Sequence, residues 1–172
     1  MFPLGHLGIG TRLLPARLRD RLPWIWFAFG CLLPDALDKP VFAAARLARH
    51  VTPFDFAALH GSRLLGHSLF FFGVLVLFAA AFPRSQRMRA VAIGVATHLL
   101  LDVVPDLLSG SRLQWPTWLL WPIFGWGFPY DTRRTVVAGF DFEGLVYLAG
   151  EAVGVALLAV EYARRRRASA FR

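Results

Sequence analysis

A histidine and an aspartate stand four residues apart at His98 and Asp102, inside a stretch that is otherwise apolar. On an α-helix, positions i and i+4 share one face about 6 Å apart along the axis, so both side chains can reach one point. Charged groups in such a stretch are costly and by default indicate function. The pair therefore has the spacing of metal ligands, and a buried His–Asp hydrogen bond that fixes helix packing is the alternative.

Further acidic groups occur in or beside other apolar runs. Asp35 and Asp38 follow Pro34, where first-turn carboxylates would face the positive end of a helix dipole, so a helix cap is the simpler interpretation of this pair alone. Asp106 continues the face of Asp102, although Pro105 could end that helix. Glu151 could ligate, relay protons or pair with an arginine.

Histidines recur in the same way. His60 and His67 are seven residues apart, nearly two helical turns, and can share a face. Imidazole nitrogen together with carboxylate oxygen suits zinc, with manganese or iron as alternatives, and the number of candidates allows one or two ions. A bound metal would activate water for hydrolysis without a protein nucleophile, and Asp38 could serve as the base. The candidate ligands are His6, Asp35, Asp38, His60, His67, His98 and Asp102.

The composition is that of a membrane protein. The chain has 172 residues, of which 56% are hydrophobic and 15% aromatic, and its mean hydropathy is +0.51. The net charge of +8 comes mainly from arginine clusters that flank apolar runs. This placement favours topology determinants beside anionic lipid headgroups and argues against nucleic-acid binding. The single cysteine, Cys31, excludes an internal disulfide.

Three segments, 64–82, 89–108 and 142–162, have about the length a bilayer requires. The basic turn between the first two, and the four arginines that begin at Arg164, belong in the cytoplasm by the positive-inside rule. His67, His98 and Asp102 then meet near the extracytoplasmic face. This topology predicts a multi-pass membrane protein with a cytoplasmic C-terminus.

The remaining segments are shorter or less regular. Residues 24–33 are too few to span and predict an N-terminal half-helix, followed at 39–59 by a loop or a surface helix. The aromatic-rich segment 109–141 predicts a re-entrant or interfacial connection. The expected fold is an all-α integral membrane bundle of about three spanning helices, forming one domain over 1–163 with a basic tail at 164–172.

An ordered set of motifs resembles the bacterial inner-membrane metal-dependent hydrolase family of the YdjM type. The set is His6-x-x-x-Gly10, Gly30-x-x-x-Pro34-Asp35-x-x-Asp38, His60 with His67-Ser68, His98-x-x-x-Asp102 and Trp121-Pro122-Ile123-Phe124. The family usually shows His-Arg-x-x-Thr-His-Ser, whereas here six residues separate His60 from His67, with glycine where threonine is expected.

The resemblance implies a helical membrane protein with distant similarity to zinc phospholipase C and the P1-type nucleases. It maps the ligands to His6, Asp35, His67, His98 and Asp102, with Asp38 and His60 as further candidates. We therefore expect a membrane-bound hydrolase of phosphoester bonds in a lipid or envelope substrate. The alternative is a non-catalytic membrane protein whose His/Asp cluster fixes helix packing or relays ions.

Overall fold

The described part of the protein is entirely helical. The computed structural model describes residues 3–48, 62–108, 117–123, 125–126 and 142–170, and no strand occurs among them. The elements are α1 (Pro3–Leu13), α2 (Ala16–Arg19), α3 (Trp24–Leu47), α4 (Leu69–Ala81), α5 (Gln86–Leu108), η2 (Thr117–Leu120) and α6 (Phe142–Ala170). The predicted all-α class is confirmed.

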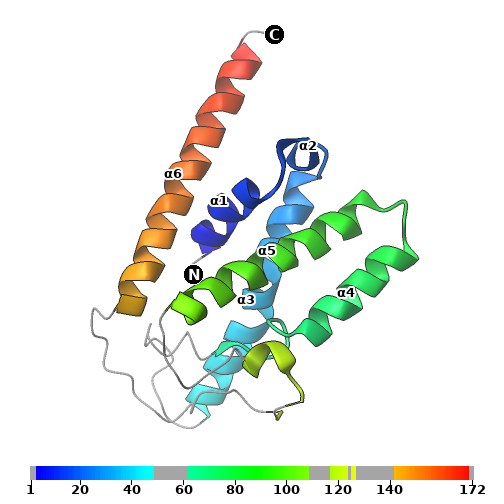
Figure 1. The fold of residues 1–172 in the computed structure, drawn as a ribbon, viewed down its shortest axis with the longest axis vertical. Helices are drawn as coiled ribbons and strands as arrows, with labels where there is room; N and C mark the ends of the chain where they lie inside the picture. The colour runs from blue at the N-terminus through cyan, green and yellow to red at the C-terminus, as the bar shows by residue number, and fades with distance from the viewer. Residues whose placement is uncertain (1–2, 49–61, 109–116, 124, 127–141, 171–172) are drawn as a thin grey trace.

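Helices α3 and α5 form the central pair and cross with their backbones in contact (Figure 1). A Cβ atom added at Gly30 would lie 2.3 Å from the Val91 carbonyl oxygen, and one added at Gly94 would lie 2.4 Å from the Phe27 carbonyl oxygen. Only glycine allows this approach. Phe27 and Cys31 pack with Ala90 in a buried apolar cluster beside the crossing.

The predicted half-helix at 24–33 is wrong, because α3 continues unbroken through Pro34 and Pro40 to Leu47. An internal proline costs a helix about 3 kcal/mol by removing a hydrogen bond and clashing with the preceding turn. The extensive packing of α3 on α5 outweighs that local preference. Residues 39–47, expected in a loop or surface helix, are therefore part of α3, and 49–59 lie outside the described residues. Helix α5 likewise continues past Pro105 to Leu108.

Helix α4 begins later than the predicted segment 64–82, at Leu69, and has 13 residues. Ser68 caps it by accepting a 3.0 Å hydrogen bond from the Phe71 amide, while residues 62–68 form a loop. None of its residues is buried, and Leu77 is 70% exposed. Across the described residues, no helix combines the length and apolar character that crossing a membrane requires. The three expected spans stay a prediction.

Helices α1 and α6 run parallel to each other (Figure 1). A Cβ atom at Gly8 would lie 2.1 Å from the Gly154 carbonyl oxygen, so these backbones also touch. At the far end, Arg12 Nη2 and Glu161 Oε2 form a 3.2 Å ion pair. Helix α6 extends to Ala170, so the predicted boundary between the domain and the basic tail falls within a helix.

Candidate metal centre

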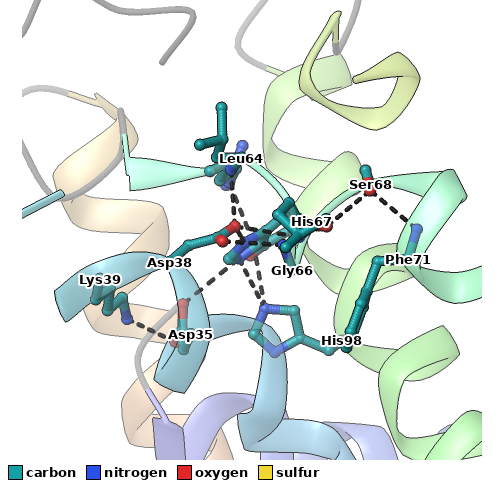
Figure 2. A network of polar contacts seen from close by, with 12 residues as sticks. Asp35, Asp38, Lys39, Leu64, Gly66, His67, Ser68, Phe71 and His98 are labelled. Carbon is teal, nitrogen blue, oxygen red and sulfur yellow. Dashed lines mark hydrogen bonds and ion pairs between the residues drawn. The ribbon is translucent and has the colours of Figure 1, made fainter. Parts of the chain in front are cut away.

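Donor atoms from four parts of the chain converge beside the α3–α5 crossing. Helix α1 supplies His6, α3 supplies Asp35, the 62–68 loop supplies His67, and α5 supplies His98 and Asp102. Figure 2 shows Asp35, Asp38, His67 and His98 pointing toward one another. Two sets of three residues bring their donor atoms within 4.8 Å of each other, namely His6 with Asp35 and His98, and His67 with His98 and Asp102.

His98 has a fixed orientation. Its Nδ1 lies 2.6 Å from the backbone carbonyl oxygen of Cys31, and a carbonyl only accepts, so Nδ1 carries the proton and donates. The lone pair of Nε2 then points into the cluster, 3.1 Å from Nε2 of His67. Such a hydrogen bond on the outer nitrogen is how proteins orient metal-ligating histidines.

His67 is oriented in the same way, by Asp38. The Nδ1 atom of His67 lies 2.7 Å from Asp38 Oδ2. The same carboxylate accepts hydrogen bonds from the backbone amides of Leu64 at 2.7 Å, Gly66 at 2.9 Å and His67 at 3.2 Å (Figure 2). Asp38 therefore holds both the loop and the imidazole, so that Nε2 of His67 faces the cluster.

The separations between donor atoms match a coordination shell. His67 Nε2 lies 3.4 Å from Asp102 Oδ2 and 3.5 Å from Asp35 Oδ1, and His98 Nε2 lies 3.6 Å from Asp102 Oδ2. Ligands bound tetrahedrally at about 2.0–2.1 Å stand roughly 3.3–3.4 Å apart. The cluster can thus surround a zinc-sized ion with little rearrangement.

His6 completes the cluster from the side of α1. Its ring stacks on His98, with centroids 3.8 Å apart and an interplanar angle of 17°. Its Nε2 atom lies 3.3 Å from Asp102 Oδ1. Asp102 thereby contacts His6 through one oxygen and His67 and His98 through the other.

Comparison with known protein families identifies the chain. The model of the YdjM inner membrane protein family matches residues 1–168, nearly the whole sequence. The chain belongs to this family. Neither the curated proteins nor the solved structures gave a match. The predicted family is therefore confirmed, and the distant similarity to zinc phospholipase C and the P1-type nucleases stays a prediction.

Arg63 is a residue of this YdjM-family site that the sequence reasoning missed. Its Nε lies 3.1 Å from Asp102 Oδ2, its guanidinium lies 4.8 Å from the centre of the Trp118 ring, and its side chain is buried. The signal was present in the family motif His-Arg-x-x-Thr-His-Ser. Aligned on 62–68, that motif places its arginine at Arg63 and its second histidine at His67, with serine and glycine at the two remaining positions.

The predicted candidates can now be placed in the YdjM-family fold. The structure brings six of them together: His6, Asp35, Asp38, His67, His98 and Asp102. His60 lies outside the described residues. Asp106 lies within α5, and the Glu151 carboxylate accepts hydrogen bonds from α1. Ligation itself stays a prediction for all seven candidates.

Burial and charge set the protonation of the cluster. Burial, reinforced by the neighbouring His98, lowers the pKa of His6 to about 4, so this imidazole is neutral at pH 7. Burial alone would lower the pKa of His67, but its hydrogen bonds to Asp102, Asp35 and Asp38 outweigh it and raise that pKa to about 10. Burial alone would raise the pKa of Asp35, but the hydrogen bond from His67 and the nearby cations hold it below its usual range.

Among the contacts of the described residues, carboxylates outnumber permanent cations in the cluster. Three carboxylates, Asp35, Asp38 and Asp102, lie here, and two permanent cations have described ion pairs with them. These cations are Arg63, 3.1 Å from Asp102, and Lys39, whose Nζ lies 2.5 Å from Asp35 Oδ2. A proton on His67 or a metal ion would add positive charge beside these carboxylates.

Proposed function

We propose that this YdjM-family protein binds one divalent first-row ion, zinc with manganese or iron as alternatives. The ligands are drawn from His6, His67, His98, Asp35 and Asp102. The observation that carries the proposal is the 3.1 Å separation between Nε2 of His67 and Nε2 of His98, both of them buried. Each ring has its other nitrogen held by an acceptor, so once a metal displaces the proton of His67, two nitrogen lone pairs converge on the same space.

A single ion fits this arrangement better than two. Both sets of three donors depend on His98. Only Nε2 of His98 points into the cluster, because Nδ1 bonds the Cys31 carbonyl, and a single imidazole nitrogen binds one metal. The two sets therefore describe alternative choices of ligands around one position.

The reaction that we propose is hydrolysis of a phosphoester. A divalent ion held here would lower the pKa of a coordinated water and polarise a phosphoryl oxygen. Lys39 lies at the edge of the cluster with its side chain 27% exposed, where it can attract an anionic group. Asp38 accepts hydrogen bonds from three backbone amides and contacts His67, which favours a positioning role for Asp38 over that of a base.

A lipid or envelope substrate is consistent with the surface of the protein. The family is one of inner membrane proteins, and α4 exposes apolar side chains that include Phe70, Leu77 and Phe78. Such a face favours contact with the apolar part of a membrane. We propose that the substrate is the phosphoester of a membrane lipid or another envelope component.

A non-catalytic metal site is the second candidate. It is favoured by burial, because His6, His67, His98 and Asp102 each keep at most 3% of their surface exposed. A catalytic site needs an open ligand position and a route for substrate, whereas a structural site is closed. A sensory or structural ion would bind the same residues.

Metal analysis followed by activity measurements tests the proposal. We expect the full chain, purified in detergent, to hold about one equivalent of metal, and Asp102→Asn to hold less than a tenth of that. Asp20→Asn is the matched control, because the Asp20 side chain is 71% exposed and lies outside the cluster. Absence of stoichiometric metal from the wild type would overturn the metal site. Stoichiometric metal without turnover of bis-p-nitrophenyl phosphate or phospholipid would favour the non-catalytic site.

A further inference from the structure

Glu151 of α6 contacts α1 directly before the histidine that α1 contributes to the cluster. Its Oε1 accepts a 3.2 Å hydrogen bond from the Leu4 amide, and its Oε2 accepts a 2.7 Å hydrogen bond from the Gly5 amide. These are first-turn amides, which have no partner within their own helix. A carboxylate at this end of a helix is also favoured by the helix dipole.

The rest of the α1–α6 contact fixes the register between the two helices. The touching backbones of Gly8 and Gly154 prevent α1 from moving closer to α6. The ion pair between Arg12 and Glu161 lies at the other end of α1, where both side chains are 25% exposed, so it contributes little to the position of His6. With 11 residues, α1 is shorter than the roughly 12–15 residues that an isolated helix needs, so its position depends on its neighbours.

His6 follows Gly5 directly, so movement of the Leu4–Gly5 backbone carries the imidazole with it. The ring has little freedom, because it stacks on His98 at 3.8 Å while its Nε2 lies 3.3 Å from Asp102. We propose that Glu151 is a positioning residue of the metal centre, which holds α1 at the height where His6 can ligate. This inference rests on the proposed function.

The consequence is that α6, which itself supplies none of the cluster's described donor atoms, controls the affinity of the cluster for metal. Glu151→Gln keeps the size of the side chain but turns one acceptor oxygen into an NH₂ donor that faces a backbone donor. The first turn of α1 then loses one hydrogen bond and the favourable charge at its end. The imidazole of His6 is displaced, while His67, His98 and the two carboxylates stay in place.

Cobalt titration of the full chain in detergent tests this inference, because Co²⁺ reports the ligand set through its visible absorption. We expect Glu151→Gln to weaken Co²⁺ binding about tenfold and to change the visible spectrum toward that of His6→Ala. Glu161→Gln is the matched control at the other end of the same helix pair, and it should stay within about twofold of the wild type. In the His6→Ala background, Glu151→Gln should have no further effect on Co²⁺ affinity.

Two results would overturn the positioning role while leaving the metal site standing. One is an unchanged affinity and spectrum in Glu151→Gln, and the other is an equal loss of affinity in the presence and absence of His6. A wild type that binds no Co²⁺ would overturn the proposed function as well. If Glu151→Gln does not fold, Gly154→Ala replaces it, since its Cβ would lie 2.4 Å from the Leu4 carbonyl oxygen and displace α1 at the same level.

Discussion

The two halves of the α3–α5 pair are both buried but differ in chemistry. In the first half, Phe27 and Cys31 pack with Ala90, and Gly30 and Gly94 bring the backbones together. In the second half, Asp35 and Asp38 of α3 face the two donor residues of α5, His98 and Asp102, together with His67. One pair of helices thus combines an apolar contact with a charged cluster.

The two halves therefore have different roles: the apolar half stabilises the helix pair, and the polar half carries the proposed metal ligands. Apolar burial of the kind in the first half stabilises a pair at roughly 25 cal/mol per Å². Buried ionic groups rarely add net stability, because desolvation offsets their attraction. We therefore expect damage to the first half to lower the free energy of unfolding, and damage to the second half to lower metal affinity.

The largest expected effect is in the apolar half. Phe27 is 2% exposed, and Phe27→Ala should lower the free energy of unfolding by about 4 kcal/mol through lost burial and a cavity. Denaturant unfolding in detergent with chelator present measures the change. The part of the protein that stays folded should bind zinc with wild-type affinity. A loss of stability below about 1 kcal/mol would show that the apolar half does not hold the pair.

Asp35→Asn makes the opposite change in the polar half. The amide keeps the shape of the side chain but removes the charge that faces the metal, so zinc affinity should fall about 100-fold, or about 2.7 kcal/mol. The Lys39 ammonium left behind is partly exposed and the buried His67 keeps Asp38 and Asp102, so the free energy of unfolding without metal should fall by only about 1–2 kcal/mol, well below the loss expected for Phe27→Ala. Competition titration and unfolding with chelator measure the two quantities. If Asp35→Asn lowered the free energy of unfolding but left zinc affinity unchanged, the polar half would stabilise the helix pair and would not bind the metal.

Zinc binding in the polar half of the α3–α5 pair should depend on pH, because a metal ligand there carries a proton. The pKa of His67 is raised to about 10, so its imidazole carries a proton at pH 7 that zinc must displace. Raising the pH removes this competition, and zinc affinity should increase about tenfold, or about 1.4 kcal/mol, per pH unit between pH 6 and 8. Isothermal titration in buffers of different ionisation enthalpy counts the protons released. Release of no proton would contradict this protonation state.

The smallest effect is expected at the border between the halves. The Cys31 side chain belongs to the apolar cluster and lies 3.4 Å from Thr97 Oγ1, whereas its backbone carbonyl orients His98. Cys31→Ala should lower the free energy of unfolding by about 1 kcal/mol and change zinc affinity by less than about threefold. A large loss of affinity would mean that the side chain, and not the carbonyl, supports His98.

Much of the site could be predicted from the sequence because its signals are local. The i, i+4 spacing placed His98 and Asp102 on one face of α5, and both lie in the cluster. The acidic pair after Pro34 lies there as well, although a helix cap was the simpler interpretation of that pair alone. Charged groups in apolar stretches are rare enough to be informative without a fold.

What the sequence did not predict depends on contacts between distant segments. The continuation of α3 through two prolines requires the surface of α5, and the late start of α4 requires the Asp38 carboxylate that folds the 62–68 loop. Arg63 lies in the site because it forms an ion pair with Asp102, which is 39 positions away in the chain. The proposed role of Glu151 depends on its contact with the N-terminus of α1, and no local sequence pattern predicts a contact between segments so far apart.

Zinc-edge X-ray absorption on the purified full chain tests the central claim most directly. We predict about one equivalent of zinc with a first shell of nitrogen and oxygen at about 2.0–2.2 Å and clear scattering from at least two imidazole rings. The imidazole scattering should weaken in a variant that lacks both His67 and His98, leaving at most the contribution of His6. A first shell of oxygen alone, or identical spectra for the variant and the wild type, would contradict a metal centre at this cluster.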